Sequence, residues 1–298
     1  MQVVRAKTAG FCMGVSLAVR RLNEALAQTP ATGNTRLATL GPIIHNPRLI
    51  RSYEEKGVVC LSSPNEVKEG DTVLIRAHGV PYEEEKSLAA KGVRLIDATC
   101  PKVKKAQLAI AAMWEHDGMA DGSLLLYGEA EHPEVRGLVS YARGNAHVFL
   151  NVDEFDAVPL APKRAYFLAA QTTQDIAGFE AVRVRVEQRL GYAVPVLHTI
   201  CDATRKRQEE VLAIAGKVDV VVVVGGKNSG NTKRLAEVAE KAGTRAILVE
   251  DVAELTASMF SGVAAVGLTA GASTPVGQVN AVEAWLLQAY GEGRKSIL

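Results

Sequence analysis

The sequence has no long apolar run, and its charges nearly balance. No stretch of its 298 residues approaches the roughly 18 apolar residues of a membrane-spanning helix, and the most apolar run, Val218–Val224, is interrupted by Asp219. The first residues are too polar for the apolar part of a signal peptide. The net charge is only +1, which argues against nucleic acid as the main partner. We therefore expect a cytoplasmic protein that binds neither membranes nor nucleic acid.

Cysteine is also scarce, with four residues in the chain. That number is too small for a disulfide scaffold of this length, and a cytoplasmic protein keeps its thiols reduced. Cys12, Cys100 and Cys201 each come just before a predicted helix, where the helix N-terminus favours a thiolate. Cys60 lies inside an apolar run instead, and we expect it to be an ordinary buried residue.

Short β-branched runs alternate with amphipathic stretches along most of the chain. Such alternation predicts an α/β protein whose sheets are largely parallel and covered by helices on both faces. The predicted strands include 36–40, 72–76, 123–127, 164–169, 218–224, 246–249 and 263–268. The predicted helices include 17–28, 102–116, 175–190, 204–217 and 232–242.

An internal repeat emerges when the three helix-preceding cysteines are taken as origins. After each cysteine come a helix and a strand that ends in glycine, and a polar residue follows four positions later: His45, His132 or Ser229. A second strand in each repeat also ends in polar segments, which are 76–79, 170–173 and 272–274. We predict three α/β units, residues 1–98, 99–197 and 198–298, related by a pseudo-threefold axis.

The repeat predicts a common site, because ligands of parallel α/β sheets bind beyond the carboxyl ends of the strands. Three units facing one another would bring the three cysteines into one central cavity. Converging thiolates repel each other unless a cation neutralises them, so we expect a metal there. Zinc and iron–sulfur clusters are the two realistic occupants. Structural zinc usually uses local cysteine pairs, which this chain lacks, whereas a four-iron cluster on three cysteines keeps one iron open.

Polar loop residues supply many hydrogen-bond donors and few fixed charges around this cavity. They are His45, His78, His132, Thr172, Ser229, Asn231 and Ser273. With the backbone N–H groups of the glycine-rich segments at 225–226 and 230–231, and with Lys227, they form a candidate cradle for a phosphate group. The alternative is that the serines and asparagine are only helix caps and turn formers, but this does not explain three histidines in matching loops.

Glu134 is the candidate proton donor, because it follows His132 and Pro133 in one of these loops. A carboxyl in an enclosed polar cavity can donate a proton when its pKa is suitably raised. The alternative is an exposed first-turn glutamate that stabilises the helix dipole. Glu129 and Glu131 compete for the same role on sequence grounds.

Several motifs, taken together and in order, resemble one enzyme family. They are residues 10–15 (GFCMGV), 41–46 (GPIIHN), 76–79 (RAHG), 97–101 (DATCP), 132–134 (HPE), 171–173 (QTT), 199–201 (TIC), 224–229 (VGGKNS) and 271–273 (GAS). The sequence resembles the 4-hydroxy-3-methylbut-2-enyl diphosphate reductases, the terminal enzymes of the non-mevalonate isoprenoid route. The motifs span nearly the whole chain, which makes the resemblance specific.

The resemblance implies a trefoil of three α/β domains around a [4Fe-4S] cluster with Cys12, Cys100 and Cys201 as its ligands. It implies that the substrate diphosphate is held by His45, His78, His132, Ser229, Asn231 and Ser273. Thr172 and Glu134 would face the allylic hydroxyl, with Glu134 supplying protons. The family's reaction uses two electrons and two protons to remove this hydroxyl as water, and yields isopentenyl and dimethylallyl diphosphates. A ferredoxin or flavodoxin is the expected electron donor.

The sequence departs from the family pattern at two places. Gly230 stands where many relatives have serine, so one hydrogen bond to the diphosphate is lost or comes from a backbone N–H. Glu131 replaces a common glycine and Glu129 is unusual, which predicts a more acidic cavity edge. Two other classes of function compete with the reductase: a zinc hydrolase or lyase, and a non-catalytic phosphate-binding or scaffold protein. Neither explains the repeat.

Overall fold

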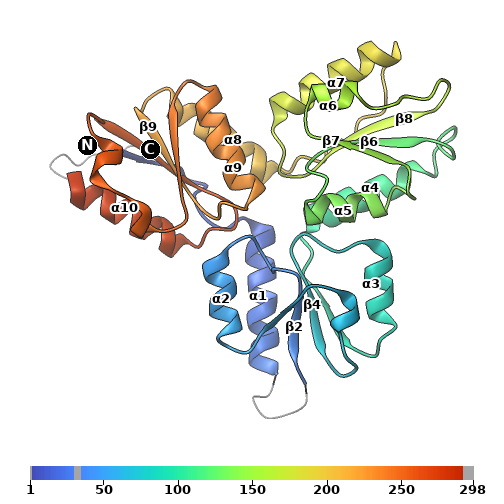
Figure 1. Ribbon diagram of the computed structural model, residues 1–298, viewed down its shortest axis with the longest axis horizontal. Helices are drawn as coiled ribbons and strands as arrows, with labels where there is room; N and C mark the ends of the chain where they lie inside the picture. The colour runs from blue at the N-terminus through green and yellow to red at the C-terminus, as the bar shows by residue number, and fades with distance from the viewer. Residues whose placement is uncertain (1, 30–34, 291–298) are drawn as a thin grey trace. The chain divides into compact units, whose positions relative to one another are not determined.

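A computed structural model describes residues 2–29 and 35–290, which form an α/β chain with three parallel sheets (Figure 1). The predicted fold class, α/β with mostly parallel sheets, is therefore confirmed. By their contacts the residues divide into two compact units. The larger unit consists of 16–44 and 50–201 and contains two sheets, and the smaller unit contains the third sheet.

The first sheet of the larger unit has the strand order β3-β2-β4-β5. Its strands are β2 (Leu37–Leu40), β3 (Val59–Leu61), β4 (Thr72–Ile75) and β5 (Arg94–Asp97). Helices α1 (Met13–Gln28), α2 (Pro47–Glu54) and α3 (Tyr82–Ala89) belong to the same stretch of chain. Leu88 of α3 packs with Val73 and Ile75 of β4 into a fully buried cluster, which covers one face of this sheet.

The second sheet of the larger unit has the order β7-β6-β8 and helices on both faces (Figure 1). Its strands are β6 (Ser123–Tyr127), β7 (Ala146–Phe149) and β8 (Tyr166–Ala170), and its helices are α4 (Pro101–Met113), α5 (Pro133–Ser140), α6 (Val152–Asp156) and α7 (Ile176–Leu190). Alternate residues of β6 point to opposite faces, as the period of a strand requires. Leu124 and Leu126 pack with α4 and α5, whereas Leu125 and Tyr127 pack with α6 and α7.

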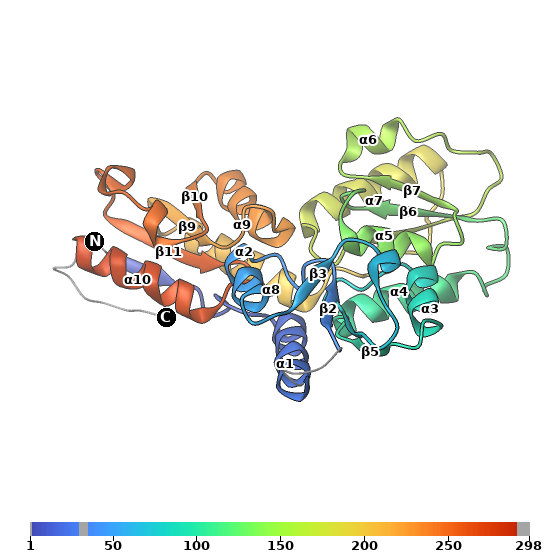
Figure 2. The same cartoon turned by 60° about the horizontal axis from the view of Figure 1, so that its bottom comes forward.

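The sheet of the smaller unit has the order β10-β9-β11-β1. Its strands are β1 (Gln2–Arg5), β9 (Val220–Val224), β10 (Arg245–Val249) and β11 (Ala265–Ala270), and its helices are α8 (Asp202–Ala215), α9 (Gly230–Lys241) and α10 (Val276–Tyr290). Val221 and Val223 face α8 and α9, and Val222 faces α10, so β9 is buried on both sides. Figure 2 shows α10 running alongside β11.

Strand order confirms the predicted internal repeat. In each sheet the first strand of the repeat is central, the second lies on one side of it and the third on the other: β3-β2-β4, β7-β6-β8 and β10-β9-β11. A further parallel partner lies beside the third strand in each case. It is β5 beside β4, an isolated bridge from Val196 to Leu168 of β8, and β1 beside β11. The chain's N-terminal strand thus completes the third sheet by pairing with β11. The predicted unit boundaries at 98 and 197 precede Cys100 and Cys201, and they stay a prediction.

The predicted elements are mostly long and buried, but no predicted helix covers α10, which has 15 residues. All seven predicted strands and all five predicted helices exist, with ends shifted by a few residues. The strands β1, β3, β5 and β7 were not predicted, because each has three or four residues and is only partly buried. Cys60 lies in β3 and is half-buried, so it is less enclosed than expected. Among the described residues, no helix is both long enough and apolar enough to cross a membrane.

Two glycines allow the strand ends of the smaller unit to approach the first turn of α9. A Cβ at Gly225, where φ is +148°, would lie 2.8 Å from Thr232 Oγ1. A Cβ at Gly271 would lie 2.1 Å from the same oxygen and 3.2 Å from Thr232 Cβ. Thr232 is fully buried, so its side chain has no space into which to retreat. The loops after β9 and β11 can therefore lie this close only because both residues lack a side chain.

We predict that Gly271→Ala destabilises the chain by about 1–3 kcal/mol, because the added methyl group overpacks a closed contact. The matched control is Gly277→Ala in α10, where an added Cβ meets nothing within 4 Å; its effect should stay within about 1 kcal/mol. Denaturant unfolding of both variants measures the difference. Equal stability of the two variants would contradict the packing described here.

Candidate active site

One backbone hydrogen bond recurs at the three cysteines that precede helices. In each case the cysteine N–H donates to the carbonyl two residues beyond the third strand of a sheet. These bonds join Cys12 to Ala272 (3.1 Å), Cys100 to Ala77 (2.9 Å) and Cys201 to Thr172 (3.0 Å). Each cysteine is thereby fixed beside the polar loop that follows β11, β4 or β8. The repeat therefore extends from strand order to the individual hydrogen bonds of the candidate site.

The three thiols have the chemistry that an iron–sulfur cluster requires. All are reduced and half-buried. Cys12 Sγ accepts a hydrogen bond from the Val15 N–H at 3.4 Å, and Cys100 is the N-cap of α4. N–H groups of a helix N-terminus favour thiolates, and soft thiolates suit iron–sulfur clusters. Cys60 differs, because it lies within a strand and burial raises the pKa of its thiol.

Glu134 lies in the first turn of α5 and is only 2% exposed. Both of its carboxylate oxygens accept hydrogen bonds from Thr172, one from the backbone N–H (2.6 Å) and one from the hydroxyl (3.0 Å). Pro133 at the first helical position fixes the backbone that presents this carboxyl, because the proline ring restricts φ. The contact between Glu134 and Thr172 therefore joins the start of α5 to the loop after β8.

Burial raises the pKa of the Glu134 carboxyl to about 7, while both hydrogen bonds from Thr172 oppose the shift by favouring the ionised form. A carboxyl with this pKa is protonated to a substantial degree at neutral pH, as a proton donor must be. The Thr172 hydroxyl can donate to the carboxylate and can accept from the carboxylic acid. It therefore remains a hydrogen-bond partner of Glu134 in both protonation states.

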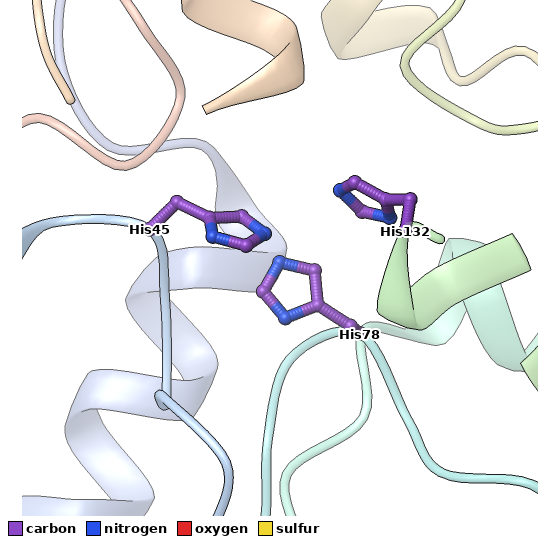
Figure 3. Close-up of side chains that lie close together, drawn as sticks. All are labelled: His45, His78 and His132. Atoms are coloured by element: carbon purple, nitrogen blue, oxygen red, sulfur yellow. The ribbon is translucent and has the colours of Figure 1, made fainter. Parts of the chain in front are cut away.

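His132 and His78 lie next to each other, and His132 contacts Glu134. His132 caps α5 and its Nδ1 accepts a hydrogen bond from the Glu134 N–H at 3.1 Å, so its other ring nitrogen, Nε2, carries a proton and is a donor. The centroids of the two rings are 5.5 Å apart, with the planes nearly perpendicular. Figure 3 shows both rings, His78 on the loop before α3 and His132 at the start of α5. The pair presents ring N–H groups of the kind that bind phosphate oxygens.

A continuous chain of contacts therefore crosses the larger unit from Cys100 to Cys201. Cys100 is hydrogen-bonded to Ala77, the chain neighbour of His78, and the His78 ring contacts the His132 ring. His132 is hydrogen-bonded to Glu134. Thr172 is hydrogen-bonded both to Glu134 and to Cys201. Every predicted site residue of the larger unit belongs to this series of contacts. Residues far apart in sequence thus form one connected cluster.

The smaller unit gathers the remaining predicted site residues. Ser273 Oγ donates to the His45 carbonyl at 3.0 Å. Ser229 caps α9 by accepting from the Thr232 N–H at 3.4 Å, so the helix-cap interpretation holds for this serine. Gly230 is the first residue of α9, and the adjacent Asn231 is 6% exposed.

Asn231 has a buried side-chain donor whose hydrogen bond is not made within the described residues. Its side-chain Nδ2 is buried, and no atom of the described residues accepts a hydrogen bond from it. An unpaired buried amide costs about 1–3 kcal/mol, so such groups usually have a partner when a protein carries its ligand. An anionic oxygen would satisfy this donor.

The structure also separates the charged residues that the sequence left in competition. Glu131 is exposed and Glu129 is half-buried, whereas Glu134 is enclosed. Glu134 is therefore the one of the three with an environment that raises its pKa to about 7. Lys227 Nζ lies 2.5 Å from Glu254, so this lysine neutralises a neighbouring carboxylate and is not a charge reserved for the cradle.

Sequence reasoning missed the residues that hold the Cys12 loop in place. Arg207 of α8 donates to the Gly10 carbonyl at 2.7 Å. Glu210, one turn further along the helix, accepts from the backbone N–H groups of Lys7 (2.8 Å) and Thr8 (2.9 Å). Arg207 is 4% exposed. Charged residues on the buried face of an amphipathic helix are the signal that could have identified them.

The chain is similar to known proteins over nearly its whole length. A family model described as "LytB protein" matches residues 3–287. The chain is 54% identical over 291 residues to the 4-hydroxy-3-methylbut-2-enyl diphosphate reductase of Nitratidesulfovibrio vulgaris (strain DP4), covering 96% of this chain and 99% of the relative. It is 44% identical over 277 residues to the reductase of Geobacter sulfurreducens, covering 92% and 93%.

Solved structures are similar as well. The E-1-hydroxy-2-methyl-but-2-enyl-4-diphosphate reductase of Plasmodium falciparum matches with a TM-score of 0.89 at 25% identity, covering 96% of this chain and 88% of that one. A solved (E)-4-hydroxy-3-methyl-but-2-enyl diphosphate reductase, described as the terminal enzyme of the non-mevalonate pathway, matches with a TM-score of 0.66 at 37% identity, covering 97% and 100%.

We predict that Thr172→Val raises the pKa of Glu134 further. Valine removes the hydroxyl that stabilises the carboxylate but leaves the backbone N–H donor in place. Infrared titration of the carboxyl band measures the pKa of Glu134 in the unaltered chain and in Thr172→Val. The Glu134→Gln variant assigns the band, because it removes the carboxyl. A band that titrates near pH 4.5, as an unperturbed glutamic acid does, would contradict the burial of Glu134.

Proposed function

This chain belongs to the LytB family of 4-hydroxy-3-methylbut-2-enyl diphosphate reductases, and we propose that it performs that reduction with a [4Fe-4S] cluster on Cys12, Cys100 and Cys201. The observation that carries the proposal is the contact chain that joins Cys100 and Cys201 through two histidines, Glu134 and Thr172. Thiolates, a raised-pKa carboxyl and phosphate-binding donors are the three components that the reaction requires.

The reaction consumes one substrate molecule, two electrons and two protons. The C–O bond to the allylic hydroxyl breaks, the oxygen leaves as water, and a C–H bond forms, which gives isopentenyl or dimethylallyl diphosphate. When bound, the cluster would pass on the electrons that an external donor supplies and would act as a Lewis acid toward the hydroxyl oxygen. Hydroxide is a poor leaving group, so the departing oxygen needs a proton from the protein.

We assign that proton to Glu134. Its carboxyl is enclosed, its pKa of about 7 leaves it partly protonated at neutral pH, and Thr172 holds both oxygens in place. Thr172, whose hydroxyl bonds to Glu134, orients the carboxyl and remains bonded to it after proton transfer. Neither Glu129 nor Glu131 combines burial with such a partner.

We assign the diphosphate to the neutral donors of the polar loops. The side chains proposed to bind it are His45, His78, His132, Ser229, Asn231 and Ser273. Gly230 offers its backbone N–H at the first turn of α9, where the helix dipole favours an anion. Binding energy from the non-reacting diphosphate would position the allylic carbon for reduction.

Alanine at Cys12, Cys100 or Cys201 should abolish cluster binding, whereas Cys60→Ala should leave it intact. The first three thiols lie at helix N-termini beside the polar loops, and Cys60 lies within β3. Iron and acid-labile sulfide measured on anaerobically purified variants test this assignment. Normal iron in any one of the three alanine variants, or its loss from Cys60→Ala, would refute the ligand set. Stoichiometric zinc and no sulfide in the unaltered chain would favour the hydrolase or lyase alternative.

Glu134→Gln should retain the cluster and bind the diphosphate but lose turnover by about 10²-fold or more, because the amide cannot donate the required proton. In the unaltered enzyme the rate should fall as the pH rises through about 7, since the carboxyl then loses its proton. Single-turnover rates from pH 6 to 9 measure both effects. Undiminished turnover by Glu134→Gln would remove Glu134 from this role.

A further inference from the structure

The proposed reduction needs electrons that neither the substrate nor the chain can supply, so an external carrier must dock where electrons can reach the cluster. The following inference rests on the proposed function. A docking surface for this purpose should lie next to one of the three cysteines. It should also be accessible and complementary in charge to the carrier.

One surface hollow of the larger unit meets the first requirement. It has a volume of about 670 Å³, and its lining includes Thr99 and Pro101, the two chain neighbours of Cys100. The hollow extends along the outer face of α4, through Lys105 and Leu108. Leu108 is eight residues beyond Cys100, which corresponds to about 12 Å along the helix axis. The hollow therefore begins at the two chain neighbours of the proposed cluster ligand and extends along α4 from there.

The helical pattern of α4 explains why this face is open. Val103, Ala106 and Ile110 are buried against the sheet, whereas Pro101, Lys105 and Leu108 share the opposite stripe. Leu108 is 56% exposed, and Leu17 of α1 lies across the hollow from the same stripe. An exposed leucine beside a second apolar side chain is the kind of small apolar centre found in transient protein interfaces.

Charge supplies the second requirement. Arg21 and Lys105 line the hollow, and within the part of the chain that the structure describes neither forms an ion pair. Lys104 forms an ion pair with Glu85 at 2.9 Å, so its charge is balanced. Asp97 also lines the hollow and accepts from the neutral Thr99 N–H at 2.9 Å, so it keeps its negative charge. Arg21 and Lys105 together exceed Asp97 by one positive charge. Because the whole chain carries a net charge of only +1, the uncompensated positive charge here is a local feature.

We propose that this hollow is the docking surface for a small acidic one-electron carrier protein of the ferredoxin class. Carboxylates of the carrier would pair with Arg21 and Lys105, and its apolar contact would cover Leu108. Such an interface gains its rate of association and its specificity mainly from charge complementarity. Weak electron-transfer contacts are also small, which suits a shallow hollow.

The test uses the iron-loaded enzyme and a plant-type [2Fe-2S] ferredoxin as the probe. The docking variant is Arg21→Glu with Lys105→Glu. The control is Lys163→Glu with Lys241→Glu, which changes the net charge equally at two exposed lysines that are not among the lining residues of the hollow. Binding of the labelled ferredoxin is followed by fluorescence anisotropy at low and high salt. Substrate reduction is measured separately with the ferredoxin and with reduced methyl viologen.

The docking variant should bind the ferredoxin about tenfold more weakly at low salt, while the control changes by less than about threefold. Added salt should remove most of the difference. Reduction driven by the small dye should be the same in both variants, because the dye needs no docking surface. A Leu108→Asn variant should weaken ferredoxin binding even at high salt.

Equal ferredoxin affinity in the two double variants would overturn this proposal, as would a dimer of the unaltered chain that the docking variant breaks, since a second copy would then occupy the face. Failure of the proposed function is distinguishable, because the unaltered enzyme would then not reduce the substrate even with the dye.

Discussion

Every sheet within residues 2–29 and 35–290 is wholly parallel, and the candidate site depends on that constraint. Parallel strands end at one edge of their sheet, so the loops that follow them collect there. A fourth strand or bridge also ends at this edge, and in each repeat it is the last strand segment before a cysteine. The hydrogen bond from each cysteine N–H to the loop beyond a third strand follows from this geometry. Three repeats of one strand order thus place three thiols in equivalent local environments.

The Glu134–Thr172 pair shows how the fold adjusts the chemistry of one residue. A carboxyl at a helix N-terminus would ordinarily be exposed and ionised, which favours the helix dipole. Here the loop after β8 encloses it, and the loss of solvation outweighs two hydrogen bonds to the carboxylate. The result is a carboxyl with a pKa of about 7, held by two neutral donors of Thr172. The same loop carries the carbonyl that fixes Cys201, so proton donor and proposed ligand share one support.

The sequence was sufficient for the fold class, the repeat and the family, and insufficient for the connections between repeats. The central strands β6 and β9 are buried on both faces and read as continuous apolar runs, which made them predictable. The edge strand β5 is partly exposed and therefore gave no such signal. That β1 pairs with β11 could not be inferred, because pairing between the two ends of a chain leaves no local pattern. Likewise, the sequence pointed to Glu134 but left Glu129 and Glu131 as competitors, and the difference in burial that separates them is visible only in the folded chain.

A chain with these residues should reduce the allylic diphosphate by two electrons. The decisive measurement is anaerobic turnover of 4-hydroxy-3-methylbut-2-enyl diphosphate with reduced methyl viologen, in which the dye oxidised is counted against the product formed. Because methyl viologen transfers one electron, we expect two dye molecules oxidised for each isopentenyl or dimethylallyl diphosphate produced. Release of inorganic phosphate or diphosphate without dye oxidation, or no consumption of the substrate by iron-loaded enzyme, would contradict it.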